Sequence, residues 1–263
     1  MIEEPYRWVE AIANRREYIE TQLATGSPII ALSCRDGILF LTFGSSRQKL
    51  FEIHDRIAMG AIGHPGDIER LRMAAIELAS TEGFTRSAAD VSLRRLAHYS
   101  LSPVMKTAFE QVYGPPFLAR LLIAEVGEVP EEDLFLRVEY DGAIASNGGG
   151  QPTRHDFAVL SATTGSAGSM ESFLEKEHRA TASLSEATNI AMDAWAVGQL
   201  TVRENGAKQI PERDEITKHR DERLAQTGLE LAILERNGKS AIRYRALSKD
   251  ELDSLGSRYG RGI

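Results

Sequence analysis

Histidine and cysteine are the residue types of this chain best suited to bind a metal or to act as a nucleophile. The six histidines are His54, His64, His98, His155, His178 and His219. Their spacings do not match a metal-binding pattern such as two histidines one turn apart on a helix. The single cysteine, Cys34, cannot form an internal disulfide, and it has no His/Cys cluster around it that would bind zinc. The sequence therefore predicts no metal site and no cofactor, and a reducing cytoplasm is the simplest compartment.

Phosphate, nucleic acid and lipid are also disfavoured as ligands. The glycine-rich stretch at 147–152 lacks the preceding strand and following helix of a phosphate loop, so a flexible turn is expected. The net charge of −7 argues against nucleic acid, and basic pairs such as Arg94-Arg95 are expected on a solvated helix face. No apolar run reaches the roughly 18 residues of a membrane span, and the acidic first residues do not resemble a secretory signal.

Apolar periodicity predicts the elements that would position any site. With 42% hydrophobic and 26% charged residues among 263, the chain can form one sizeable core. Helices are expected at 6–23, 66–82, 91–112, 169–177, 184–200 and from 248. Strands are expected at 28–34, 38–43, 50–53, 57–62, 118–124, 134–140, 143–146, 157–162, 229–234 and 241–245. Strand blocks separated by helix pairs favour two stacked antiparallel sheets with helices on the outer faces.

Three stretches of this pattern carry specific expectations. Ser87-Ala88-Ala89-Asp90 can cap the helix expected at 91–112, and Pro103 inside that helix can kink it. Ser248 and Glu251 have the spacing of a capping box at the start of the last helix. Residues 202–226 are heavily charged with few apolar side chains, which predicts a mobile surface insertion or partial disorder.

The blocks resemble, in their order and spacing, segments of proteasome α subunits. The first similar segments are Arg16-Glu17-Tyr18, Gly26-Ser27, Asp36-Gly37 and Lys49-Leu50-Phe51-Glu52-Ile53-His54-Asp55-Arg56-Ile57, which continues to Gly63. The later ones lie at 121–124, 140–142, 165–168, 173–178, 229–234 and 245–248, and the residues at 53–56, 71–72 and 124–126 look most like actinobacterial subunits. The resemblance covers nearly the whole chain apart from the glycine-rich turn and residues 202–226. It implies an α+β fold, the four-layer α-β-β-α sandwich of the N-terminal-nucleophile hydrolase (proteasome subunit) type.

The same resemblance implies one α-subunit domain spanning residues 1–263. A gate segment and a ring-contact helix are expected at 1–26, and a sandwich core at 27–201 and 227–255. The charged insertion at 202–226 and a flexible tail at 256–263 complete the expected organisation.

Catalytic members of this family expose an N-terminal threonine whose own amine serves as the base, supported by a lysine and an aspartate. The corresponding position here is about Ser27, which is internal and follows the helix that ring formation requires. Phe43 falls near the place of the aspartate, and the link at 44–48 is so short that the segment carrying the lysine is expected to be missing. The chain is therefore predicted to have no catalytic residues, with catalysis in the β subunits.

The resemblance also implies a pocket that binds the C-terminus of an activator. Lys49 matches the family's lysine between neighbouring α subunits, where an ammonium can receive a terminal carboxylate; the alternative is an ordinary exposed strand lysine. Glu17 would border that pocket and bond the activator's penultimate tyrosine, unless it is simply a surface acid. Gly63 would allow close backbone approach, unless it is only a turn glycine. His64 stands where small or aliphatic residues are common.

The N-terminus is expected to form the gate. Its residues are Met1, Ile2, Glu3, Glu4, Pro5, Tyr6 and Arg7, and they do not reproduce the Tyr-Asp-Arg motif of archaeal subunits. Copies of a short tail arranged around a symmetry axis meet at that axis, so these segments could close an entrance. Tyr18, on the following helix, is expected at the contact between α subunits or, alternatively, in the core.

The implied function is a homo-heptameric ring that caps rings of proteasome β subunits, gates the entry of protein substrates and docks a hexameric AAA ATPase or another activator. Partnership with nucleic acid or membrane is not expected. Two alternatives remain open. One is a self-compartmentalised N-terminal-nucleophile peptidase or amidohydrolase processed to expose Ser27, which an intact Met1 or Ile2 terminus would exclude. The other is a free-standing binding module with a degenerate hydrolase fold, which would elute as a monomer or dimer.

Overall fold

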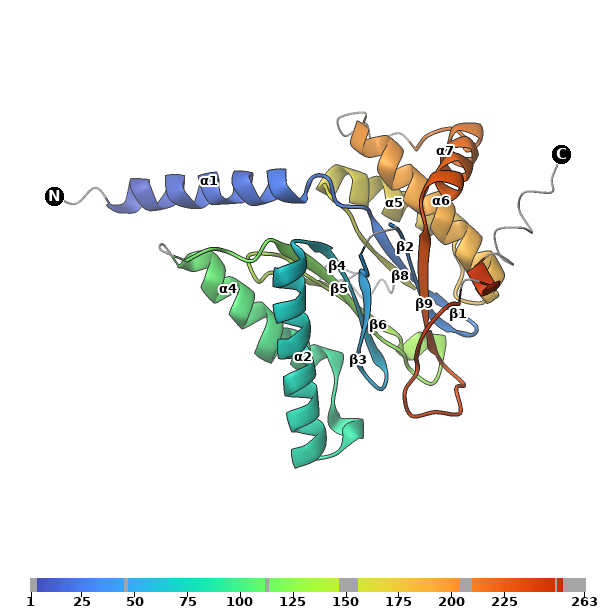
Figure 1. Ribbon diagram of the computed structural model, residues 1–263, viewed down its shortest axis with the longest axis horizontal. Coiled ribbons are helices and arrows are strands. Elements are labelled where there is room, and N and C mark those ends of the chain that lie inside the picture. Colours follow the sequence, from blue (N-terminus) through green and yellow to red (C-terminus); the bar gives the residue numbers. More distant parts are fainter. Residues whose placement is uncertain are drawn as a thin grey trace.

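Two antiparallel sheets lie face to face at the centre of the chain (Figure 1). The computed structural model describes residues 4–44, 47–111, 114–146, 156–203, 210–248 and 250–252. The first sheet has the order β10 (Tyr244–Ala246), β9 (Leu229–Glu235), β2 (Gly37–Phe43), β1 (Ile29–Cys34) and β8 (Phe157–Leu160). The second has the order β3 (Leu50–His54), β4 (Ile57–Gly63), β5 (Ala119–Glu125), β6 (Leu134–Val138) and β7 (Ile144–Ser146).

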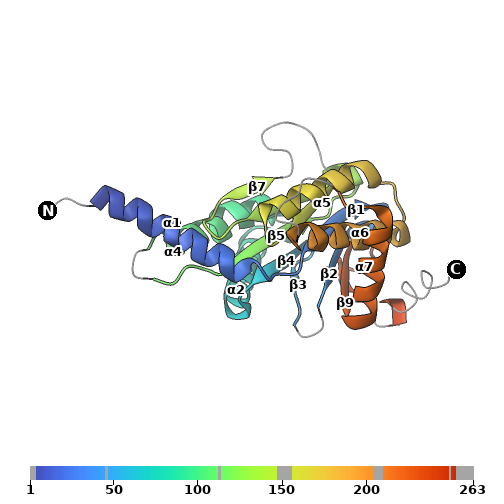
Figure 2. The same cartoon turned by 90° about the horizontal axis from the view of Figure 1, so that it is seen from above.

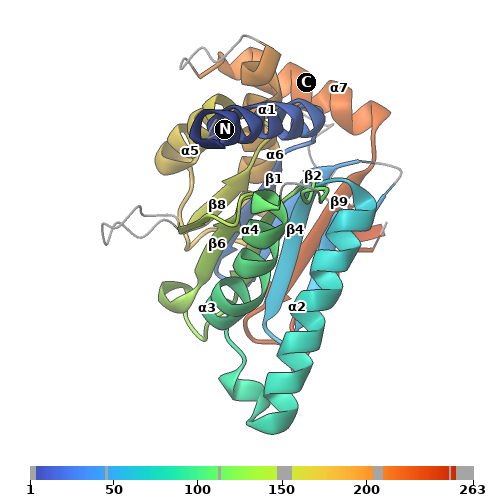
Figure 3. The same cartoon turned by 90° about the vertical axis from the view of Figure 1, so that its left-hand side faces the viewer.

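Helices cover the outer face of each sheet (Figures 1 and 3). The first sheet is covered by α5 (Thr164–Glu177) and α6 (Leu184–Arg203), with α7 (Arg213–Gln226) packed on α6. The second is covered by α2 (Pro65–Thr85), α3 (Leu93–Leu96) and α4 (Ser102–Glu110). The first helix, α1 (Glu4–Leu23), extends away from the sheets on one side (Figures 1 and 2).

Side-chain alternation along the central strands creates the layers. In β1, Ile30 and Leu32 belong to the core beneath α5 and α6, whereas Ile29 and Ala31 belong to the core shared with the second sheet. Successive strand side chains point to opposite faces, so a strand buried on both faces is apolar at every position. A third core lies between the second sheet and α2–α4. The four-layer α-β-β-α sandwich predicted from the sequence is therefore confirmed.

The helix expected at 91–112 is confirmed over residues 93–110, but it is not a uniform α-helix. Ser87 caps only a short 3-10 turn at Ala88–Asp90, through its hydroxyl oxygen and the backbone N–H of Ala89 (3.2 Å). Beyond α3, the chain makes a π-helical turn, η2 (Ala97–Leu101), before α4. Pro103 lies in the first turn of α4, where its missing N–H is tolerated, and the π turn before it absorbs the irregularity.

The interpretation of residues 202–226 as mobile or partly disordered is also wrong for its second half. Residues 213–226 form α7, in which Ile216 and His219 are buried. His219 stacks on Trp195 of α6 with 5.9 Å between ring centroids, and Arg220 pairs with Asp193 of α6 at 2.7 Å. A charged sequence thus forms a packed helix because its partners lie on a neighbouring helix.

Other expectations have mixed outcomes. The capping box is confirmed, since the backbone N–H of Ser248 donates to Glu251 Oε2 (2.8 Å). α5 begins at Thr164, five residues before the expected start, with Thr163 as its cap. The glycine-rich turn at 147–152, His155 and the tail at 256–263 lie outside the described residues. Over the described ranges, no helix combines the length and apolar character needed to cross a bilayer.

Candidate functional site: a lysine-bearing cavity beside Ser27

Lys49 lies in a cavity of about 710 Å³ between the start of β3 and the end of β4. The cavity is lined by Thr25, Gly26, Ser27, Arg47, Gln48, Lys49, Phe51, Ala61, Ile62, Gly63, Pro65, Ile68 and Glu69. The structure therefore brings together two of the residues predicted for the activator pocket, Lys49 and Gly63. The other two lie elsewhere. Glu17 is exposed on α1, and His64 is exposed at the start of α2, where its Nδ1 accepts from the Gly66 N–H (3.2 Å).

The backbone of Lys49 is held by a carboxylate from the opposite sheet. Glu230 of β9 accepts hydrogen bonds from the N–H of Lys49 (3.0 Å) and the N–H of Leu50 (2.9 Å). These amides begin β3, an edge strand, so the carboxylate satisfies donors at the start of that strand. The hydroxyl of Tyr244 donates to the carbonyl of Leu50 (3.0 Å) from the same side. These contacts from the first sheet therefore hold the backbone of Lys49 in place.

The Lys49 ammonium is half-buried and donates to the carbonyl oxygen of Phe43 (2.9 Å). Burial lowers the pKa of Lys49, and the nearby Glu230 carboxylate opposes that shift. Burial likewise raises the pKa of Glu230, although the amides of Lys49 and Leu50 and the Lys49 charge favour its ionised form. A carboxylate that enters the cavity would offer Lys49 a stronger, charge-assisted partner than a neutral carbonyl.

The charges at the cavity favour an anionic guest. Its lining includes the cations Lys49 and Arg47 and one carboxylate, Glu69. Glu69 is already bound by Arg72, at 2.8 Å from Nε and 2.7 Å from Nη2, and this bonding lowers the pKa of Glu69. The acid of the lining therefore has a cationic partner of its own, whereas the partner of the Lys49 ammonium is a neutral carbonyl.

Two glycines allow neighbouring segments to approach closely at the wall of the cavity. Gly63 has φ of +143°, and a Cβ there would lie 2.0 Å from the carbonyl oxygen of Leu118. A Cβ at Gly26 would lie 2.1 Å from Cγ2 of Ile62. A side chain at Gly63 would force the backbone apart, and one at Gly26 would displace the buried Ile62 side chain, so both positions favour glycine. Gly63 is thus more than a turn glycine.

Ser27 lies in the same cavity but is not arranged as a nucleophile. Its nitrogen is in the peptide bond that follows Gly26, and its Oγ accepts from the indole N–H of Trp195 (3.0 Å). Phe43, at the position where the resemblance would place the aspartate, instead packs its ring on Trp195 with centroids 4.3 Å apart. One expectation requires correction: a lysine is not missing here, because Lys49 lines the same cavity as Ser27.

The remaining predicted residues lie on α1. Tyr18 is 52% exposed, which excludes the core alternative and leaves its ring free to contact another chain. Met1, Ile2 and Glu3 of the predicted gate lie outside the described residues, and Glu4 to Arg7 form the start of α1. Among the described residues, no group of three or more His, Cys, Asp or Glu is placed to hold a metal ion.

Sequence reasoning missed Glu230 and Trp195. Glu230 is 181 positions from Lys49, and a lone acid in an apolar strand is a weak signal for such a contact. Trp195 lies on the buried face of a predicted helix, where an aromatic residue is expected for packing alone. An acid next to the buried apolar run of a predicted strand is the signal that could have pointed to Glu230, because a half-buried carboxylate needs donors.

The fold and the cavity together define a class of protein. A sandwich of two antiparallel sheets between helix layers is the architecture of N-terminal-nucleophile hydrolases. The position expected for the nucleophile, Ser27, lies two residues before β1 and is blocked by the preceding chain. The family model described as "Proteasome subunit" matches residues 23–201. This chain belongs to the proteasome subunit family.

Its relatives are α-type subunits from actinobacteria. The chain is 31% identical to the proteasome subunit alpha of Streptomyces scabiei, over 94% of this chain and 88% of that protein. It is 29% identical to the proteasome subunit alpha of Streptomyces coelicolor, over 94% of this chain and 86% of that protein. The corresponding protein of a Nocardioides species is 28% identical over the same shares. These matches confirm the resemblance to actinobacterial-type α subunits, and they agree with a non-catalytic member of the family.

Proposed function

We propose that this chain is a non-catalytic α subunit of a bacterial 20S proteasome. In this proposal it forms a homo-heptameric ring that caps proteolytic β rings in the cytoplasm, gates the entry of protein substrates and docks a hexameric AAA ATPase or another activator. The observation that carries the proposal is the Lys49 cavity: a half-buried ammonium, positioned by Glu230, faces an opening beside a blocked nucleophile position.

Docking is supported by the charge and the shape of this cavity. A terminal carboxylate can replace the Phe43 carbonyl as the partner of Lys49, and Arg47 adds a second positive charge at the rim. A peptide end that inserts into such a groove gains a charge-assisted hydrogen bond in a partly desolvated place. Glu17 lies on α1 outside the cavity of its own chain, so its proposed contribution requires the α1 helix of a neighbouring copy.

The docking proposal is tested by removing the ammonium. This chain is co-expressed with its β partner, and the Lys49→Ala particle is compared with a Lys176→Ala particle, because Lys176 is an exposed lysine on α5. Lys49→Ala should abolish activator-stimulated protein degradation while ring assembly and basal cleavage of short peptides remain intact. Lys176→Ala should behave as the wild type. Undiminished stimulation in the Lys49→Ala particle would remove this lysine from the docking site.

The gating proposal is tested by deleting residues 1–7. The shortened chain should assemble, and the particle should hydrolyse short peptides faster than the wild type because the entrance is less occluded. An unchanged rate in an intact particle would argue against a gate formed by these residues. Intact mass of the purified chain also separates the proposal from the self-processed peptidase, whose N-terminus would be Ser27.

A further inference from the structure

α1 is anchored to the sandwich by a charged cluster of Glu20, Arg120, Glu139 and Tyr140, which we call the seat of α1 and which the proposed docking site does not use. α1 extends from the body of the chain (Figures 1 and 2), and Trp8 and Val9 near its free end are 45% and 67% exposed. Near its other end, Ile19 and Leu23 are buried in the core between the two sheets. The direction of the helix therefore depends on contacts made by its last turns.

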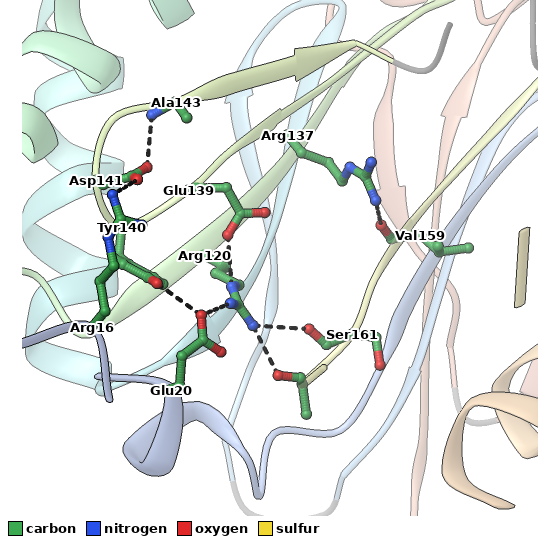
Figure 4. A network of polar contacts seen from close by, with 11 residues as sticks. Arg16, Glu20, Arg120, Arg137, Glu139, Tyr140, Asp141, Ala143, Val159 and Ser161 are labelled. Carbon is green, nitrogen blue, oxygen red and sulfur yellow. Dashed lines mark hydrogen bonds and ion pairs between the residues drawn. The ribbon is translucent and has the colours of Figure 1, made fainter. Parts of the chain in front are cut away.

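One of those contacts is an ion pair with a buried arginine. Glu20 Oε1 accepts from Nη2 of Arg120 (2.5 Å) and from the hydroxyl of Tyr140 (2.8 Å), as Figure 4 shows. Arg120, on β5, has a side chain only 5% exposed. Its Nε donates to Glu139 Oε2 (2.7 Å) and its Nη1 to the carbonyl of Ala162 (2.8 Å). A single guanidinium therefore joins α1, the second sheet and the segment that leads from β8 into α5.

The electrostatics of the cluster favour the paired state. Burial opposes the charge of Arg120, but the carboxylates of Glu139 and Glu20 outweigh it and raise the pKa of the guanidinium. Burial and the hydrogen bond to Glu20 raise the pKa of Tyr140 to about 12, so the phenol keeps the proton that it donates. Two donors from separate segments, the Arg120 guanidinium and the Tyr140 hydroxyl, thus converge on the Glu20 carboxylate of α1.

Other contacts hold α1 one turn earlier. Arg16 pairs with Asp141 at 2.9 Å, and Arg15 donates to the carbonyls of Phe109 and Gln111 at 2.7 Å each. These contacts reach the β6–β7 turn and the end of α4. Of these contacts with α1, the Glu20–Arg120 pair is the one that connects the helix to the segment following β8.

We propose that Arg120 is a positioning residue for the gate: through Glu20 it sets the direction in which α1 leaves the sandwich. This inference rests on the proposed gating function. About 24 Å of helix separates Glu20 from Glu4 at a rise of 1.5 Å per residue. A tilt of about 10° at the seat would move the free end by about 4 Å, enough to displace a segment that must meet its copies at a ring axis.

The test acts from the α1 side, because Arg120→Met would leave two carboxylates without their partner and could prevent folding. Glu20→Gln keeps the shape of the side chain and removes its charge, which should shift the ratio of seated to unseated helix by about tenfold. The matched control is Glu171→Gln. Glu171 lies on α5 and pairs with Arg137 of β6 at 3.0 Å, so it is a helix-to-strand pair of the same kind that does not involve α1.

Two readouts separate this inference from the gate itself. Spin labels at Ala11→Cys on α1 and Ser80→Cys on α2, both exposed positions, report the distance between helix and body in particles diluted with unlabelled chain. The native Cys34 is fully buried and does not compete for the label. Glu20→Gln should broaden the distance distribution and raise peptide hydrolysis severalfold, and Glu171→Gln should change neither. The deletion of residues 1–7 is measured beside them.

The outcomes are distinct. If the deletion raises hydrolysis but Glu20→Gln leaves the distances or the hydrolysis as in the wild type, the positioning role of Arg120 is wrong. An equal change in both measurements with Glu171→Gln would also overturn it. If the deletion has no effect while the Glu20→Gln distances broaden, the gate fails as a function, and the seat remains only a determinant of helix direction.

Discussion

The ion pair between Arg236 and Asp133 provides a direct test of how the two sheets are held together. Arg236 follows β9 of the first sheet, and Asp133 precedes β6 of the second. The pair is bidentate with both distances at 2.8 Å, and the side chains are 3% and 1% exposed. Asp133 also accepts from the hydroxyl of Ser33 (2.6 Å) and the N–H of Gly127 (3.0 Å). Its carboxylate is therefore fully enclosed, with an arginine as its cationic partner.

Replacement of Arg236 by methionine should lower the free energy of unfolding by about 3 kcal/mol. Removing one partner of a buried pair costs about 3–5 kcal/mol, because the remaining charge stays desolvated. The lower end applies here because Ser33 and Gly127 still donate to Asp133. The control is Arg245→Met. Arg245 contacts Glu235 and Glu251 at 2.7 and 2.8 Å but is 41% exposed, so its loss should cost less than about 1 kcal/mol.

The assay is urea unfolding followed by tryptophan fluorescence, in which the buried Trp195 should give most of the change because Trp8 is already 45% exposed in the folded chain. All variants are compared at one chain concentration, since assembly adds to apparent stability, and the dependence on urea should stay the same if the folded state is unchanged. Adding Asp133→Asn to Arg236→Met removes the unpaired charge and should recover much of the loss. A loss for Arg236→Met no larger than that for Arg245→Met would refute the reasoning.

Three further predictions concern single groups. Burial raises the pKa of Tyr140 and of Tyr244 to about 12, above the value of about 10 for an unfolded tyrosine. The resulting stabilisation is complete below pH 10 and is lost as the pH rises to 12, so the urea midpoint should fall between these pH values. A midpoint that does not change with pH over this range would contradict the prediction. Burial also raises the pKa of the Cys34 thiol, so iodoacetamide should modify the native chain far more slowly than the urea-unfolded chain, and equal rates would show that the thiol is accessible. Gly63→Ala should lower the free energy of unfolding by about 1–3 kcal/mol because of its φ of +143° and the Leu118 carbonyl 2.0 Å from the added Cβ; a neutral effect in the same urea assay would contradict this.

Local signals in the sequence predicted the elements that depend on local periodicity. The apolar runs of β1 and β2 and the turn between them are confirmed, since Gly37 has a positive φ that suits the tight turn. The region at 87–112 was predicted less well. Its apolar spacing is helical, and residues 93–110 are helical throughout, but Pro103 cannot donate in a helix interior and a π turn precedes it.

The helix α7 could not be predicted from its own residues. Its stabilising partners, Trp195 and Asp193, lie on α6. They give this strongly charged segment one face that packs on the protein, and the sequence of the segment alone does not show it. The same limit applies to the candidate site. Lys49 was predicted from a motif, but Glu230, which holds its backbone, lies on a distant strand of the other sheet. Contacts between residues far apart in sequence arise from topology, and a single sequence does not encode them in a local pattern.

The most direct measurement is electron microscopy of the complex that purifies when this chain is co-expressed with its β partner, combined with intact mass of the chain. We expect end rings with sevenfold symmetry built from this chain, with its N-terminal helix retained. A chain that begins at Ser27 and hydrolyses peptides without any partner would contradict the account.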